Sequence, residues 1–159
     1  MTNTTTGPAK TAKTAKTRVP AVDGWFTMDP DDPRLLGSRC ATCGTFVFPP
    51  TEVFCPNPDC DGAEFAVVPL SRRGRVWSYT TNQYQPPPPF VPTEPFSPYD
   101  IAAVELPDEK LVVLGQVAPG ASGVGLEVGT DVELVLDTLY EDDQHEYVVW
   151  KWRPTEVSR

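Results

Sequence analysis

The four cysteines of this chain fall in one short stretch, and their spacing constrains the fold more than any other feature. Cys40 and Cys43 form one close pair, Cys55 and Cys60 form a second, and eleven residues separate the pairs. Four thiolates in this pattern suit tetrahedral Zn²⁺, and such a site is structural because no coordination position remains for water or substrate. The spacing therefore predicts a zinc ribbon in which Cys40, Cys43, Cys55 and Cys60 hold one Zn²⁺.

Two other uses of the cysteines stay open at this level. The second pair is wider than usual, with four residues between Cys55 and Cys60. Two disulfides would fit an oxidising compartment, but no apolar segment typical of a secretion signal precedes the pairs. Iron on the same thiolates would give a rubredoxin-like electron carrier. Zinc is the favoured interpretation. We expect a cytoplasmic protein without a membrane segment, because no apolar run approaches the length needed to span a bilayer.

Charge is distributed unevenly along the chain. The formal net charge is −9 over 159 residues, but residues 1–22 contain four basic residues and no acidic one. The remainder carries 22 acidic residues against nine basic ones, which is a formal charge of −13. Because neutralised phosphates supply most non-specific nucleic-acid affinity, an acidic body disfavours nucleic acid as a partner.

The chain divides into three predicted segments. Residues 1–22 contain an Ala-Lys-Thr repeat and almost no large apolar side chain, so we expect a disordered tail. Residues 23–71 hold an aromatic anchor around Trp25 and Phe26, followed by the ribbon. Residues 72–159 carry β-rich runs separated by turns, and five strands with long first and third connections fit an OB barrel. The predicted fold is mainly β: a rubredoxin-like zinc ribbon followed by a five-stranded OB-fold barrel. The expected strands of the barrel are 75–83, 99–106, 111–117, 132–136 and 147–152.

Residues 85–98, QPPPPFVPTEPFSP, form a proline-rich connector between the first two of those strands. Successive prolines favour the stiff polyproline II conformation, so this arm should project from the barrel. It is either a rigid spacer or a segment that presents Phe90 and Phe96 to a partner or a ligand channel. Phe90 and Phe96 are therefore candidate partner contacts.

The motifs occur in an order that resembles one known family. CATCG is followed by FPP, the second cysteine pair, GRVWSYT, VELPDEKLVVLGQV, VGTDVELVL and WKWRP, over roughly residues 34–154. This order is similar to that of the DUF35 family, whose members combine a zinc ribbon with an OB fold. Two features depart from the family pattern. A proline-broken DPDDP stretch replaces a helical hairpin found in many members, and the second cysteine pair is widened.

The resemblance implies a function as well as a fold. DUF35 proteins are accessory subunits of thiolase-fold enzymes that act on acyl-CoA thioesters by thiolase, aldolase or acyl-transfer chemistry. The resemblance thus implies a non-catalytic subunit bound to a thiolase-fold partner, with an acyl-CoA thioester at or near the interface. Because such a partner is expected to be a two-fold dimer, we expect two copies of each chain in the complex.

The sequence offers no convincing active site of its own. If zinc takes every cysteine, none remains as a nucleophile, and His145, the single histidine, follows an acidic turn where a solvated role is favoured. The glycine-rich loop with Gly120, Gly123 and Gly125 does not connect a strand to a helix, so it is a poor dinucleotide-binding loop. We do not expect this chain to be an enzyme alone.

Arg72, Arg73 and Arg75 form the local basic cluster of the acidic body. Simple charge balance is the favoured explanation. Guanidinium groups also match phosphate geometry, which makes the cluster a candidate site for the phosphates of CoA.

A second candidate function is single-stranded nucleic-acid binding. OB barrels stack bases on aromatic side chains, and four such residues lie on predicted strands: Trp77, Tyr79, Trp150 and Trp152. The acidic body argues against this alternative.

Overall fold

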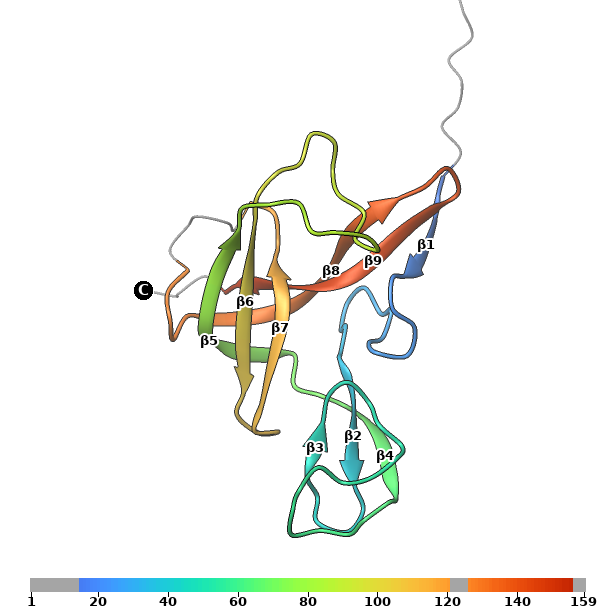
Figure 1. Ribbon diagram of the computed structural model, residues 1–159, viewed down its shortest axis with the longest axis vertical. Coiled ribbons are helices and arrows are strands. Elements are labelled where there is room, and N and C mark those ends of the chain that lie inside the picture. The colour runs from blue at the N-terminus through green and yellow to red at the C-terminus, as the bar shows by residue number, and fades with distance from the viewer. Residues whose placement is uncertain (1–14, 121–125, 156–159) are drawn as a thin grey trace, which may run out of the picture.

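A computed structural model of the protein describes residues 15–120 and 126–155, and every regular element in them is a β-strand (Figure 1). Within these ranges no helix is long and apolar enough to cross a membrane. Residues 1–14 of the expected tail, and Gly123 and Gly125 of the glycine-rich loop, lie outside the described residues. The strands are β1 (Thr17–Pro20), β2 (Leu36–Cys40), β3 (Phe46–Val47), β4 (Phe65–Pro69), β5 (Arg73–Asn82), β6 (Tyr99–Leu106), β7 (Leu111–Val117), β8 (Asp131–Glu141) and β9 (His145–Pro154).

Strands β5 to β9 form the barrel that the sequence predicted. They pair in the order β9-β7-β6-β5-β8, and β8 closes the barrel by pairing with β9. The β7–β9 pairing is parallel, whereas the other four pairings are antiparallel. This connectivity is that of a five-stranded Greek-key OB barrel.

The barrel interior is filled by side chains that alternate along the strands. Trp152 on β9 is fully buried, and it lies against Gly115 on β7, where an added Cβ would come within 2.8 Å of the indole ring. A glycine at this position therefore makes room for the largest side chain of the core. The other fully buried apolar residues of the barrel strands are Val76, Ala102, Val104, Leu106, Val132, Leu134 and Val148.

Strands β2, β3 and β4 form the separate three-stranded sheet of the ribbon, with β2 in the middle. Ser38 on β2 is fully buried, and its hydroxyl donates to the Thr51 carbonyl at 2.8 Å and accepts the Thr51 N–H at 2.9 Å. These two bonds hold the loop that follows β3. The chain passes from the ribbon sheet to the barrel sheet between Pro69 and Arg73.

An aromatic cluster joins the ribbon to the barrel. The Trp150 ring on β9 lies 5.8 Å from Phe48 of the ribbon, 5.7 Å from Phe26 and 6.1 Å from Trp25, measured between ring centroids. The aromatic anchor expected before the ribbon therefore packs against the barrel. A polar contact supports the same joint, because Glu109 Oε1 accepts hydrogen bonds from the Ser71 N–H at 2.7 Å and the Ser71 hydroxyl at 2.8 Å.

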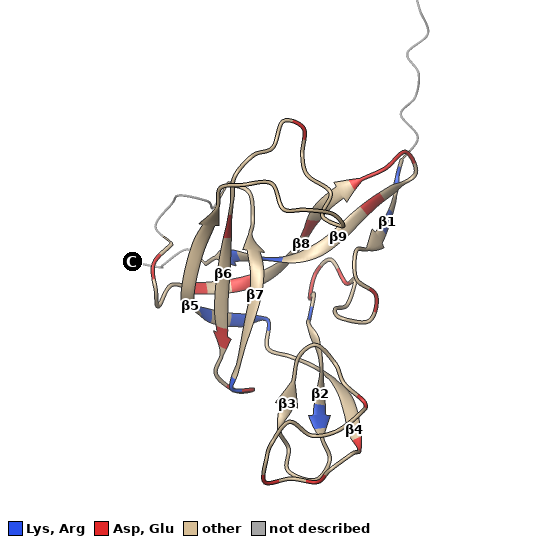
Figure 2. Cartoon of the chain, viewed as in Figure 1, with Lys and Arg blue, Asp and Glu red and all other residues tan. Residues whose placement is uncertain are grey.

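The expectation of a disordered tail up to residue 22 is wrong for β1. Thr17–Pro20 pairs in parallel with β9 from His145 to Val148. Arg18 Nε lies 3.4 Å from Glu146 Oε1, and Lys16 forms an ion pair with Glu141. Strand pairing uses backbone groups and needs no large apolar side chain, so the composition of this segment did not reveal it. Its basic residues match the acidic β8–β9 hairpin (Figure 2).

The β8–β9 hairpin is longer than the sequence predicted. Asp137 was expected to end the fourth barrel strand, but β8 continues to Glu141. Asp137 stays within the strand because β8 keeps pairing with β9 up to Glu141, and its carboxylate accepts a hydrogen bond from buried Lys151 at 2.8 Å. At the turn, Asp142 Oδ1 accepts the N–H groups of Gln144 and His145 at 2.8 and 2.6 Å.

Candidate metal centre and neighbouring surfaces

The four cysteines converge in the ribbon, where Cys43 also lines a pocket with the β6–β7 turn of the barrel. Cys40 ends β2, Cys43 follows in the next turn, and Cys55 and Cys60 lie on the loop between β3 and β4. Their Sγ atoms all lie within 4.8 Å of one another, with 3.9 Å between Cys40 and Cys60 and 3.6 Å between Cys43 and Cys55. Tetrahedral Zn–S bonds of about 2.3 Å place sulfurs about 3.8 Å apart, so the donor set fits zinc.

The disulfide alternative does not fit this geometry. A disulfide needs sulfurs about 2.05 Å apart. All four cysteines are free thiols at much longer separations. Cys40 and Cys55 are buried whereas Cys43 is exposed, so the site lies at the surface of the ribbon.

Hydrogen bonds and burial shift the pKa values of Cys43 and Cys60 in opposite directions. Cys43 Sγ lies 3.1 Å from Thr45 Oγ1, and hydrogen bonds from the Thr45 side chain and backbone lower the pKa of Cys43 to about 6. The Gly62 N–H lowers the pKa of Cys60, but burial and the three neighbouring sulfurs outweigh it and raise that pKa to about 12. Cys43 is thus prepared as a thiolate, whereas Cys60 must lose a proton to bind metal.

Gly62 matters for the shape of the site. A Cβ at this position would lie 2.8 Å from both Cys40 Sγ and Thr42 Oγ1, closer than real Cβ contacts. The Gly62 carbonyl also accepts the Cys55 N–H at 3.0 Å. Gly62 therefore lets the widened second pair fold tightly onto the first.

We expect the apparent zinc affinity to rise with pH. Zinc binds thiolates, so every thiol that is protonated in the metal-free protein must release its proton. With a pKa of about 12, Cys60 holds its proton at neutral pH, whereas Cys43, with a pKa of about 6, does not. Competition with a colorimetric chelator at two pH values, about 6 and about 8, measures this dependence. Equal affinities at both would contradict the four-thiolate site.

The three arginines of the basic cluster have different environments. Arg72 donates to the Leu134 carbonyl at 3.2 Å and to the Asp31 carbonyl at 2.8 Å, which is a structural role. Arg75 Nε lies 3.3 Å from Asp131 Oδ1 at the surface. Arg73 is exposed and makes no side-chain hydrogen bond or ion pair with any described residue. Figure 2 shows these basic positions at the start of β5, beside acidic positions of β8.

The proline-rich arm does not project as the sequence predicted. It folds over one end of the barrel (Figure 1), where the Phe90 ring stacks on Tyr99 at 5.9 Å and the Phe96 ring meets Tyr99 edge-on at 6.4 Å. The arm bends back because aromatic contact with β6 buries surface that a free arm would expose to water. Contact of Phe90 and Phe96 with a partner stays a prediction.

Of the four aromatic residues proposed for base stacking, two are buried and two are exposed. Trp150 and Trp152 are 9% and 0% exposed, because they belong to the joint and the core, so neither can stack on a base. Trp77 and Tyr79 on β5 are exposed. Two of the four aromatic residues that the nucleic-acid alternative used are therefore unavailable for stacking.

His145 is not arranged for catalysis. Its Nδ1 lies 3.4 Å from Asp142 Oδ1 at the hairpin turn, and its ring lies 5.8 Å from that of Tyr147. In the part of the chain that the structure describes, no serine, threonine or cysteine hydrogen-bonds to the imidazole. The geometry supplies no activated nucleophile at this histidine.

The four-thiolate ribbon and the closed barrel define a class of protein, a rubredoxin-like zinc ribbon followed by an OB-fold domain. Residues 29–66 match the family described as "ChsH2, rubredoxin-like zinc ribbon domain", and residues 67–137 match "ChsH2, C-terminal OB-fold domain". The chain belongs to the DUF35 family of zinc-ribbon and OB-fold proteins.

Relatives and one solved structure agree with this membership. The chain is 35% identical over 113 residues to benzoylsuccinyl-CoA thiolase subunit BbsA of Thauera aromatica, covering 69% of this chain and 68% of the relative. It is 32% identical over 125 residues to a DUF35 domain-containing scaffold protein of Methanocaldococcus jannaschii, covering 77% of this chain and 82% of the relative. A solved chain described as Ltp2-ChsH2(DUF35) aldolase superposes with a TM-score of 0.56 at 27% identity, covering 76% of this chain and 84% of that one.

Proposed function

We propose that this chain is a non-catalytic subunit that binds a thiolase-fold enzyme and supports its action on an acyl-CoA thioester. The observation that carries the proposal is the match over most of the length of relatives named as a thiolase subunit and a scaffold. The solved relative is described as an aldolase, so thiolase and aldolase chemistry are both compatible with the family. We expect two copies of each chain, because a thiolase-fold dimer would carry two equivalent docking sites.

An apolar surface on the barrel supports docking of a partner. Ala103 on β6 pairs with Leu114 on β7 and with Ser78 on β5, next to the β-bulge that contains Trp77. Trp77, Val112 and Leu114 are 63%, 49% and 64% exposed. We call these three residues the outer face. Contiguous exposed apolar residues on a strongly charged protein mark an interaction site.

We expect Leu114→Glu to weaken the complex with a thiolase-fold partner. A buried, unpaired carboxylate at an interface costs several kcal/mol, whereas the exposed side chain contributes little to the stability of the free chain. Co-expression followed by size exclusion and light scattering measures both association and copy number.

Val67→Glu is the matched control, because Val67 is 59% exposed on β4 of the ribbon and lies away from the outer face. If Val67→Glu abolished the complex and Leu114→Glu did not, the docking surface would lie on the ribbon and not on the outer face. Separate elution of the two wild-type chains, or turnover of an acyl-CoA by this chain alone, would contradict the accessory-subunit proposal.

We also propose that Arg73 contacts a CoA phosphate within the complex, with Arg75 beside it. Arg73→Glu should raise the KM of the complex for the thioester roughly 10- to 100-fold, because a charge-assisted hydrogen bond is worth roughly 1.5–3 kcal/mol. Assembly should be unaffected. Lys110→Glu makes the same charge change on an exposed turn and serves as the control. An equal KM in both variants would assign Arg73 to charge balance, as the sequence favoured.

A further inference from the structure

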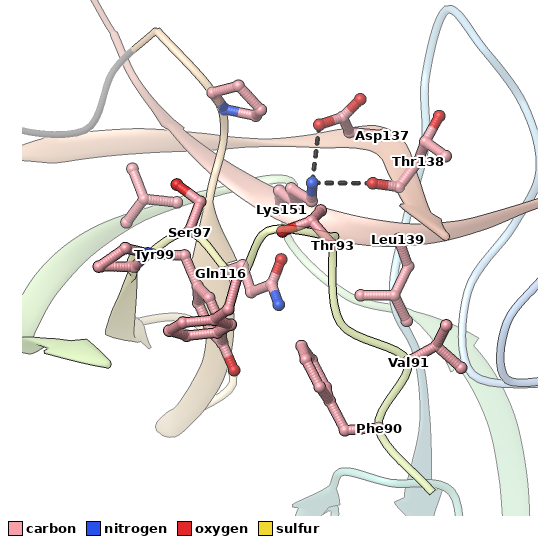
Figure 3. A pocket seen from close by; sticks show the side chains of 14 residues that line it. Phe90, Val91, Thr93, Ser97, Tyr99, Gln116, Asp137, Thr138, Leu139 and Lys151 are labelled. Carbon is pink, nitrogen blue, oxygen red and sulfur yellow. Dashed lines mark hydrogen bonds and ion pairs between the residues drawn. The ribbon is translucent and has the colours of Figure 1, made fainter. Parts of the chain in front are cut away.

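A cavity of about 430 Å³ lies under the proline-rich arm, between the arm and the strands of the barrel. Phe90 and Val91 come from the arm, Leu139 from β8 and Lys151 from β9 (Figure 3). The volume falls in the range of small-molecule sites, about 300–1,000 Å³. The stacked Phe90 and Tyr99 rings hold the wall of this cavity in place before any ligand arrives.

Two polar side chains reach the cavity with unused hydrogen-bonding capacity. Lys151 is 6% exposed, and its ammonium donates to Asp137 Oδ2 at 2.8 Å and to the Thr138 carbonyl at 2.9 Å. An ammonium has three donors, so one N–H has no acceptor among the described residues. Gln116 pairs with Lys151 across the parallel β7–β9 strands, and its side-chain amide makes no hydrogen bond with any described residue. Both residues line the cavity, and Figure 3 shows the Lys151 ammonium beside Asp137 and Thr138.

The charge of the cavity restricts the ligand. Lys151 and Asp137 are its charged lining residues, and they compensate one another. A carboxylate ligand would lose its hydration on entering a neutral site, in a protein whose formal net charge is −9. No unpaired positive charge in the site would offset that desolvation cost. A neutral acceptor oxygen can take the spare Lys151 N–H without this cost.

We propose that this cavity binds a neutral aromatic or alicyclic carbonyl compound. Its oxygen accepts hydrogen bonds from Lys151 and Gln116, and its ring packs between Phe90 and Leu139. This site is separate from the metal centre and does not depend on the proposed docking of a thiolase-fold enzyme.

Three probes of similar size test the proposal on the full, zinc-loaded chain: acetophenone, ethylbenzene and benzoate. Chemical-shift titrations should show saturable changes at the Gln116 side-chain amide and at Leu139 with acetophenone. We expect ethylbenzene, which lacks the oxygen, to bind about 10- to 100-fold more weakly, the value of two net hydrogen bonds. Benzoate should bind more weakly than acetophenone. Equal affinity for ethylbenzene, or tighter binding of benzoate, would overturn the carbonyl assignment.

Two variants identify the site without disturbing the buried ion pair. Gln116→Leu removes one of the two donors, so it should weaken acetophenone binding about three- to tenfold and leave ethylbenzene binding unchanged. Leu139→Trp should fill the cavity and abolish binding of both. Val67→Ala, at an exposed position on β4 of the ribbon, is the control and should change neither. The proposal is wrong if wild-type protein shows no saturable shift at these residues, or if Leu139→Trp binds acetophenone as wild type does.

Discussion

Cys43→Ser should release the metal and unfold the ribbon. The ribbon sheet contains three short strands, one of them only two residues long, so its own core is small. A structural Zn²⁺ in such a domain supplies about 10–16 kcal/mol of apparent binding free energy, which is also folding free energy. We expect zinc content to fall from one ion per chain to none, and the amide resonances of the ribbon to collapse to unfolded positions while those of the barrel persist.

Thr42→Ser is the matched control, because it changes the neighbouring residue without removing a thiolate. This variant should keep its zinc. Elemental analysis of natively produced protein also decides between zinc and iron. Stoichiometric iron without zinc, or full zinc retention by Cys43→Ser, would contradict the structural zinc site.

Trp150→Ala should destabilise the whole protein and loosen the joint between its two parts. The ring is 9% exposed, contacts three aromatic residues from two other segments, and donates its indole N–H to the Leu114 carbonyl at 3.1 Å. Truncation of a buried tryptophan costs about 3–5 kcal/mol. Urea unfolding followed by circular dichroism measures the loss, and small-angle scattering reports whether the ribbon changes its position relative to the barrel.

Trp77→Ala removes the same side chain from an exposed position on the same barrel. This control should change the free energy of unfolding by about 0.5 kcal/mol or less, as exposed substitutions usually do. Similar losses in the two variants would mean that the aromatic joint contributes no more than the surface does.

The sequence predicted best those elements whose pattern lies within one short stretch of the chain. The predicted ranges 99–106 and 111–117 coincide with β6 and β7, because apolar runs are separated there by a turn that starts at Pro107. That turn closes with the Lys110 N–H donating to the Pro107 carbonyl at 3.3 Å. The cysteine spacing likewise predicted that these four thiols converge, since ligands so close in sequence leave few alternative arrangements.

What the sequence did not predict depends on pairs of residues far apart in the chain. Strand β1 has no apolar pattern, and its partner on β9 lies more than a hundred residues away. Lys151 and Asp137 meet only because β8 and β9 pair, so the cavity beside them carries no local signal. The sequence placed Trp150 on the last strand of the barrel, but it did not predict that its ring packs against Trp25 and Phe48.

Strand β1 also bears on how the protein avoids self-association. The first half of β9 extends beyond the region where it pairs with β7, and β1 occupies that side of the strand from His145 to Val148. Backbone bonds flank the pairing at both ends, from the Thr17 N–H to the Gln144 carbonyl at 3.0 Å and from the Ala21 N–H to the Val148 carbonyl at 2.8 Å. An open strand edge is a template for aggregation with other chains. The N-terminal segment therefore acts as a cover for this edge, and a chain shortened to begin after Pro20 would expose it.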